Sequence, residues 1–141
     1  MNEQPVKFAT KIALVIRSDL EPWQKLNVAA FLSSGIAAAF PAAIGATYED
    51  ASGTQYHALL GEPILIYGAD RAALTRALDR AIARSVTAAL YTEEMFATTH
   101  DAANRAAVKT VLRPELKLVG LAFRAERKVI DKIVDGLKFH A

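Results

Sequence analysis

The 141-residue chain contains no cysteine, so it can form neither a disulfide nor a thiolate metal site. This absence suits a reducing compartment, and we expect a cytoplasmic protein. The sequence has no glycine-rich phosphate loop, and its three histidines do not have the spacing of a helical metal motif. The sequence therefore predicts no metal and no other cofactor.

Clustered basic residues are also missing. Lysine and arginine number 17 against 15 acidic residues, and no run of them occurs. Sequence-specific nucleic-acid binding generally requires such clusters, so we expect no DNA partner. Residues 1–9 are polar, predicted to be loose, and lack the basic start and apolar stretch of a secretory signal.

No charged residue occurs between residues 26 and 48, a length that is sufficient to cross a bilayer. The stretch nevertheless contains Asn27, Gly35 and Pro41, and most of its apolar residues are alanine. These features predict a packed core helix and no contact with a membrane.

Short apolar runs rich in branched residues predict four main strands, at residues 11–17, 64–67, 86–91 and 116–123. Three helices are predicted, at residues 28–40, 71–84 and 126–138. Asn27 is the expected N-cap of the first helix and Pro41 its stop, and Asp70 is the expected N-cap of the second. The apolar stripe of that second helix consists of Leu74, Ala77, Leu78, Ala81 and Ile82.

Residues 47–60 predict a β-hairpin, because Ala51-Ser52-Gly53 is a turn-forming set between two strand-like segments. Strands that alternate with helices predict an α/β protein with one domain over residues 1–141. We expect a three-layer sandwich in which helices flank a central mixed four-stranded sheet, with the hairpin as an addition.

Several segments, taken in order, resemble the archaeal and eukaryotic-type peptidyl-tRNA hydrolases. The segments are IRSDL (residues 16–20), a lysine before VAAF (residues 28–31), Gly61-Glu62-Pro63, and VIDKIVDGLKF (residues 129–139). WQKLNVAAFLSSG together with YEDASG is similar to an uncharacterised bacterial family of unknown function that shares the fold of those hydrolases. The resemblance implies the peptidyl-tRNA hydrolase-like fold and a homodimer, in which the hairpin is a candidate contact.

The resemblance also implies catalytic residues for cleaving the ester that joins a peptide to tRNA. These residues fall on Lys25, Glu94 and Thr98 in this sequence. A carboxylate can orient water, and an ammonium group can stabilise the developing oxyanion. The geometry requires the loops after the first and third strands to emerge at one end of the sheet.

Each of these residues also has a simpler interpretation. Lys25 can simply be a surface lysine stacked on Trp23. Glu94 can simply be an acidic residue in the first turn of a helix, where the helix dipole favours it. Glu93 is an equally good carboxylate, and Thr98 or Thr99 suits the N-cap of a helix over residues 101–109. His100 followed by Asp101 also suits a base with its orienting partner.

Asp19 and Asn27 are candidate substrate-binding residues, although Asp19 also suits an acceptor for loop N–H groups. Asn27 stands where the hydrolases have a second lysine, and Phe31 stands near the position of a glutamine. Three hypotheses follow. The chain is a hydrolase of an ester-linked or nucleotide-bearing substrate, or a non-catalytic ligand-binding or regulatory homodimer that retains only the fold. The third hypothesis is an assembly partner whose hairpin adds to the sheet of another protein.

Overall fold

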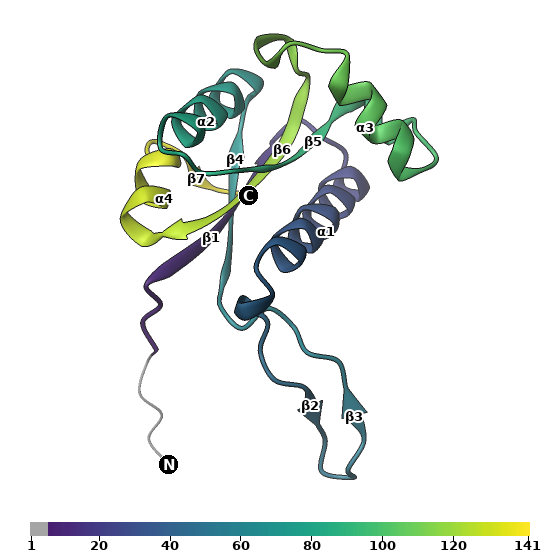
Figure 1. Ribbon diagram of the computed structural model, residues 1–141, viewed down its shortest axis with the longest axis vertical. Helices are drawn as coiled ribbons and strands as arrows, with labels where there is room; N and C mark the ends of the chain where they lie inside the picture. Colours follow the sequence, from purple (N-terminus) through teal and green to yellow (C-terminus); the bar gives the residue numbers. More distant parts are fainter. Residues whose placement is uncertain (1–5) are drawn as a thin grey trace.

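The computed structural model describes residues 6–141 (Figure 1). The main sheet contains β1 (Thr10–Arg17), β4 (Ile64–Ala69), β5 (Ala89–Thr92), β6 (Leu118–Glu126) and β7 (Lys138–Phe139). The helices are α1 (Pro22–Ala39), α2 (Arg71–Ala83), α3 (Asp101–Lys109) and α4 (Arg127–Ile133). Three short 3₁₀ helices are η1 (Pro41–Ala43), η2 (Glu93–Phe96) and η3 (Arg113–Glu115), and a separate hairpin contains β2 (Tyr48–Glu49) and β3 (Gln55–Tyr56).

The main sheet is mixed, with the strand order β5-β6-β1-β4-β7. Strand β1 is parallel to β4 and antiparallel to β6, and β6 is antiparallel to β5. Strands β1, β4 and β5 therefore run in the same direction. Their carboxyl ends lie at the same edge of the sheet, where α/β proteins tend to bind ligands.

Helices cover both faces of this sheet, so the α/β layering agrees with the prediction. On one face, Val28, Leu32 and Ile36 of α1 pack with alternate residues of β1. On the other face, α2 and α4 pack against the intervening residues, which include Ala13 and Val15 (Figure 1). Strand β1 is buried on both faces because each set of its side chains meets a helix layer.

The structure corrects the start of the first helix. Helix α1 begins at Pro22, so Asn27 lies inside the helix and is not its N-cap. Glu21 and Gln24 form a capping box, in which the Gln24 side chain accepts a hydrogen bond from the Glu21 backbone nitrogen at 3.0 Å. Proline at the first helical position adds to this start signal, because its missing N–H would have no partner there.

The end of the chain corrects the number of strands, which is five and not four. Helix α4 ends at Ile133 and does not continue to Lys138. A turn follows, closed by a hydrogen bond from the Leu137 nitrogen to the Val134 carbonyl oxygen at 3.0 Å, and Gly136 supplies its left-handed backbone with φ of 85°. The chain then forms β7, which pairs with β4, and Phe139 stacks on Tyr67 with ring centroids 5.1 Å apart. Two-residue strands carry too little alternation to be recognised in a sequence.

The predicted second helix and hairpin are both present. Asp70 caps α2 by accepting a hydrogen bond from the Ala73 nitrogen at 2.8 Å. Four residues of the predicted stripe are buried, and Ile82 is the exception, with 42% of its surface exposed. The hairpin extends away from the main sheet (Figure 1). Its strands are short, with two residues each, and an antiparallel bridge between Ile44 and Leu60 closes its base.

Within the described residues, no helix is long and apolar enough to cross a membrane. The uncharged stretch forms most of α1, η1 and the start of the hairpin. The prediction that residues 1–9 are loose falls in part on residues 1–5, which lie outside the described residues. Residues 6–8 form neither a helix nor a strand.

Candidate functional site

The loops that follow β1 and β5 meet at the carboxyl edge of the sheet, although β6 separates the two strands. Arg17, the last residue of β1, donates a hydrogen bond to Glu93 at 2.7 Å and another to Asp19 at 2.6 Å. Burial alone lowers the pKa of Arg17, but its hydrogen bonds to Glu93 and Asp19 outweigh this effect and raise the pKa. Arg17 therefore stays charged and fastens the two loops together.

Four aromatic rings form a connected array beside this junction. The Trp23 ring meets Phe96 at 5.8 Å, Phe96 meets Tyr91 at 5.2 Å, and Tyr91 meets Phe31 at 5.8 Å between centroids. Trp23 and Phe31 come from α1, whereas Tyr91 and Phe96 come from β5 and η2. Such pairs stabilise the packing of α1 against the loop after β5.

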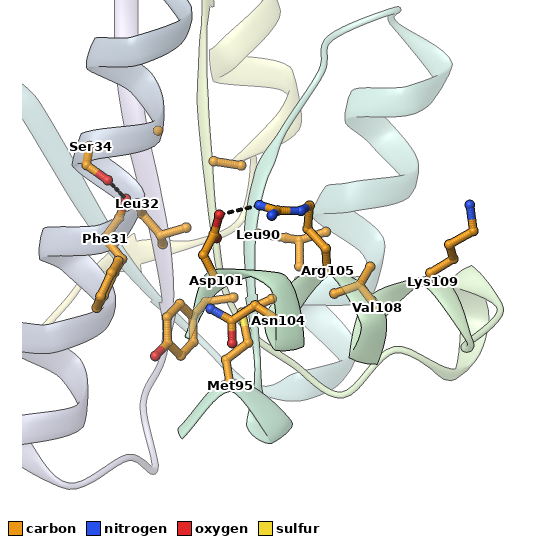
Figure 2. A pocket seen from close by; sticks show the side chains of 13 residues that line it. Phe31, Leu32, Ser34, Leu90, Met95, Asp101, Asn104, Arg105, Val108 and Lys109 are labelled. Atoms are coloured by element: carbon orange, nitrogen blue, oxygen red, sulfur yellow. Dashed lines mark hydrogen bonds and ion pairs between the residues drawn. The ribbon is translucent and has the colours of Figure 1, made fainter. Parts of the chain in front are cut away.

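The array borders a groove, here named the α1–α3 groove, which runs between α1 on one side and η2 with α3 on the other. One part has a volume of about 500 Å³ and is lined by polar side chains as well as aromatic rings. The adjoining part continues along α1 and has a volume of about 460 Å³. Figure 2 shows Asp101 and Asn104 of α3 opposite Phe31 and Ser34 of α1. Cavities of this size accommodate small organic molecules.

The helical repeat explains why α1 contributes to this groove. Trp23, Asn27 and Phe31 are spaced four residues apart, so they lie on one face of the helix. Gly35 allows α1 to lie close to β5, because a Cβ atom at this position would be 3.1 Å from the Cβ atom of Ala89.

The opposite wall is held by local hydrogen bonds. The Thr98 hydroxyl can donate to the Met95 carbonyl oxygen at 3.1 Å or to the side-chain oxygen of Asn104. His100 is the N-cap of α3, since its Nδ1 atom accepts a hydrogen bond from the Ala103 nitrogen at 3.2 Å. The interpretation of Thr98 or Thr99 as the N-cap is therefore wrong.

The α1–α3 groove brings together two of the residues that the sequence singles out, Asn27 and Thr98. Lys25 lies in α1 but lines a different groove, on the side of the helix near β4 and the chain end. Glu94 lies in η2 and lines neither groove. Asp19 is bound to Arg17 and not to backbone N–H groups.

Glu93, the alternative carboxylate, is the one that pairs with Arg17. Sequence reasoning missed Arg17 and the aromatic array. The spacing of Trp23, Asn27 and Phe31 was a usable signal, but only after the helix start had been placed at Pro22. Among the described residues, no three side chains of His, Asp or Glu gather closely enough to hold a metal ion.

Comparison with known proteins gives a family and a structural relative. A solved structure of a protein of unknown function from Agrobacterium tumefaciens strain C58 is 48% identical, with a TM-score of 0.93. The match covers 96% of this chain and 100% of that one. Curated proteins give no match. Neither similarity names an activity, so the resemblance to peptidyl-tRNA hydrolases stays a prediction. Because its residues 10–141 match the family model, the chain belongs to the family described as "Protein of unknown function (DUF2000)".

Proposed function

We propose that the protein binds a small molecule that contains a planar aromatic ring, such as a nucleoside, in the α1–α3 groove. The observation that carries this proposal is the exposure of two large rings beside the groove. Trp23 is 60% exposed and Phe31 is 56% exposed, although each packs against another ring of the aromatic array. Exposed aromatic faces at a cavity provide stacking surfaces for a flat ligand.

The polar side chains of the groove add directional contacts. Asn27 and Asn104 carry amides, each with donor and acceptor atoms, and Thr98 carries a hydroxyl. A nucleobase presents donors and acceptors along its edge, which suits amide groups, while its face suits aromatic rings. The rim residues Asp101 and Arg105 form an ion pair with each other. Lys109 also lines the groove and forms no ion pair among the described residues. The groove therefore favours a ligand with a neutral ring and tolerates a negative charge at the Lys109 end.

Intrinsic fluorescence tests this proposal, because Trp23 is the single tryptophan of the chain and lines the groove. We expect adenosine to change the Trp23 emission saturably, whereas a non-aromatic ring of similar size does not. Replacing Phe31 by alanine removes a stacking surface and should weaken binding about tenfold. Leu26→Ala is the matched control, because Leu26 is exposed on α1 but lines the other groove. Equal affinities of wild type and Phe31→Ala would reject the proposal.

Ester hydrolysis by Lys25, Glu94 and Thr98 is a second candidate function. It is supported by the meeting of the loops after β1 and β5, which the Arg17–Glu93 ion pair holds together. Lys25 and Thr98 line separate grooves, so a substrate would have to reach around the amino end of α1. A peptidyl-tRNA or aminoacyl-ester substrate tests this function. Equal background rates for wild type and Lys25→Ala would exclude it.

We also propose that the protein is a homodimer in the cytoplasm. The hairpin supports a role in self-association, since Tyr48 and Tyr56 are 53% and 51% exposed and lie on paired strands. Analytical ultracentrifugation of the wild type and of the Tyr48→Ser, Tyr56→Ser double variant tests the proposed dimer by measuring the molecular mass in solution. A monomeric wild type would remove the dimer from the proposal and leave the ligand groove unaffected.

A further inference from the structure

A groove between α2 and α4, here named the α2–α4 groove, gathers basic side chains from segments that are far apart in the sequence. It lies on the face of the sheet opposite α1, where α2 and α4 are neighbours (Figure 1). Its volume is about 620 Å³, and it shares no lining residue with the α1–α3 groove. The basic residues that line it are Arg80 and Arg84 at the carboxyl end of α2, and Lys128 and Lys132 of α4.

The helical repeat produces this cluster, which does not form a run in the sequence. Arg80 and Arg84 are four residues apart, as are Lys128 and Lys132, so each pair lies on one face of its helix. Charges of the same sign at this spacing repel each other. The groove brings the two pairs together and adds to the repulsion, which an anion bound between the helices relieves.

The acidic residues of the groove do not balance these charges. Asp131 and Asp135 also line it, but Asp131 is already paired with Lys11 at 2.7 Å. Within residues 6–141, none of the ion pairs involves Asp135 or any of the four basic residues. The four cations of the groove therefore face the single unpaired carboxylate of Asp135, and the groove has a net positive charge.

Backbone oxygens hold the two arginines in position. Nη1 of Arg80 donates to the carbonyl oxygens of Ile133 and Asp135, at 3.3 and 2.9 Å, where α4 ends. Nη1 of Arg84 donates to the Arg80 carbonyl oxygen at 3.0 Å. These contacts use Nη1 of each guanidinium group and leave Nε and Nη2 for a ligand. Because both side chains are already fixed, a ligand loses less affinity to the cost of ordering them.

We propose that the α2–α4 groove binds a compact anion with several linked phosphate groups. Guanidinium groups bind phosphate oxygens through paired hydrogen bonds, and lysine ammonium groups contribute charge. A chain of phosphates can contact the arginines of α2 and the lysines of α4 at once, whereas a single phosphate cannot. The two carboxylates interrupt the positive surface, which favours a compact anion over an extended nucleic-acid strand. The proposal is independent of the proposed function, because the two grooves share no lining residue.

Titration calorimetry with inorganic tripolyphosphate, in a buffer without magnesium, tests the proposal. We expect saturable binding to the wild type that is about tenfold tighter than the binding of orthophosphate, because the longer anion reaches both helices. Higher salt should weaken this binding, since all the contacts involve charges. Equal affinities for tripolyphosphate and orthophosphate, or no saturable binding of tripolyphosphate, would overturn the proposal.

Three charge variants localise the binding to the groove. Lys132→Gln removes a cation and should weaken tripolyphosphate binding about fivefold. Asp135→Asn removes the unpaired carboxylate, keeps the carbonyl oxygen that holds Arg80, and should strengthen binding about threefold. Lys117→Gln is the matched control, because Lys117 is exposed and directly precedes β6 at the carboxyl edge of the sheet. All three replaced side chains are exposed, so the variants should fold as the wild type does.

The variants and a nucleic-acid comparison provide the remaining outcomes. Equal affinities of Lys132→Gln and Lys117→Gln for tripolyphosphate, or weaker binding by Asp135→Asn, would contradict binding in this groove. A single-stranded RNA oligonucleotide carries the same phosphate chemistry in an extended form, and we expect it to bind more weakly than tripolyphosphate. Tighter binding of the RNA would replace the compact anion by a nucleic acid and overturn the proposal.

Discussion

Arg17 and Glu93 form an ion pair at 2.7 Å across the carboxyl edge of the sheet. Arg17 is the last residue of β1, Glu93 directly follows β5, and β6 lies between these two strands. Arg17 is nearly buried, with 14% of its side chain exposed, and it also donates to the Leu118 carbonyl oxygen of β6 at 3.4 Å. The pair therefore ties the loop after β1, the start of β6 and the loop after β5 to one another.

Glu93→Gln should loosen this junction, whereas Glu94→Gln should not. The first change removes the charge that pairs with Arg17, and the half-exposed position limits the expected loss to about 1 kcal/mol of unfolding free energy. Glu94 forms no ion pair among the described residues. Urea denaturation of both variants measures the difference. Equal stability of the two variants would contradict the structural role of the pair.

Gly120→Ala should destabilise the contact of α1 with the sheet. A Cβ atom at this position of β6 would lie 2.7 Å from Cγ1 of Val28 and 2.9 Å from Cδ1 of Leu32. Both side chains are buried in the core, so we expect the free energy of unfolding to fall by about 1–3 kcal/mol. Gly45→Ala is the control, since its nearest neighbours are 3.5 Å away, and it should leave the melting temperature nearly unchanged.

Thr92→Val should make the protein more stable. Thr92 is 2% exposed, and its hydroxyl oxygen is buried without a hydrogen-bond partner. A methyl group in place of this hydroxyl removes the desolvation cost, and the expected gain is about 1 kcal/mol. Thr98→Val is the opposite case, because the Thr98 hydroxyl has hydrogen-bond partners in Met95 and Asn104. This variant should lower the free energy of unfolding by about 1 kcal/mol. Thermal unfolding that shifts in the same direction for both variants would refute this assignment.

Acidification should open the hairpin turn before the main sheet unfolds. The Tyr56 hydroxyl, then the backbone N–H groups of Thr54 and Ser52, hydrogen-bond the Asp50 carboxylate and lower its pKa. Because the pKa is lower in the folded hairpin, this stabilisation is present above the unfolded value of about 3.9. It is lost as the pH falls through the folded pKa.

Amide hydrogen exchange at Ser52 and Thr54 measures this effect. We expect protection of both amides to fall on acidification, after correction for intrinsic exchange. Asp50→Asn keeps an oxygen acceptor but does not titrate, so its hairpin should show no such change. A wild-type hairpin whose protection stays constant through the titration of Asp50 would count against the prediction.

Much of the fold could be predicted because its main elements carry strong local signals. The central strand and β4 are apolar runs, Asp70 marks the start of α2, and residues 51–53 mark the hairpin turn. Strand β7 could not be predicted, because it has two residues and exists through pairing with Tyr67 and Gly68. Pro22 is a valid sequence signal for the start of α1. The signal was missed because Asn27 was interpreted as the N-cap.

The candidate site was less accessible from the sequence. The meeting of the loops after β1 and β5 depends on β6 lying between those strands, and nothing local specifies that order. Misplacing the start of α1 also hid which side of the helix each residue occupies. Lys25 and Asn27 are two residues apart, so they point to different flanks of α1 and line different grooves.

The central claim is that the α1–α3 groove holds a planar ligand, and intermolecular NOEs to bound adenosine test it most directly. We predict NOEs from the base protons to the Met95 methyl group and to the rings of Trp23 and Phe31, which all line the groove. Asn27→Ala should weaken these signals. If adenosine gives no NOE to these side chains, or gives NOEs only to side chains of α2 and α4 on the opposite face of the sheet, the account is contradicted.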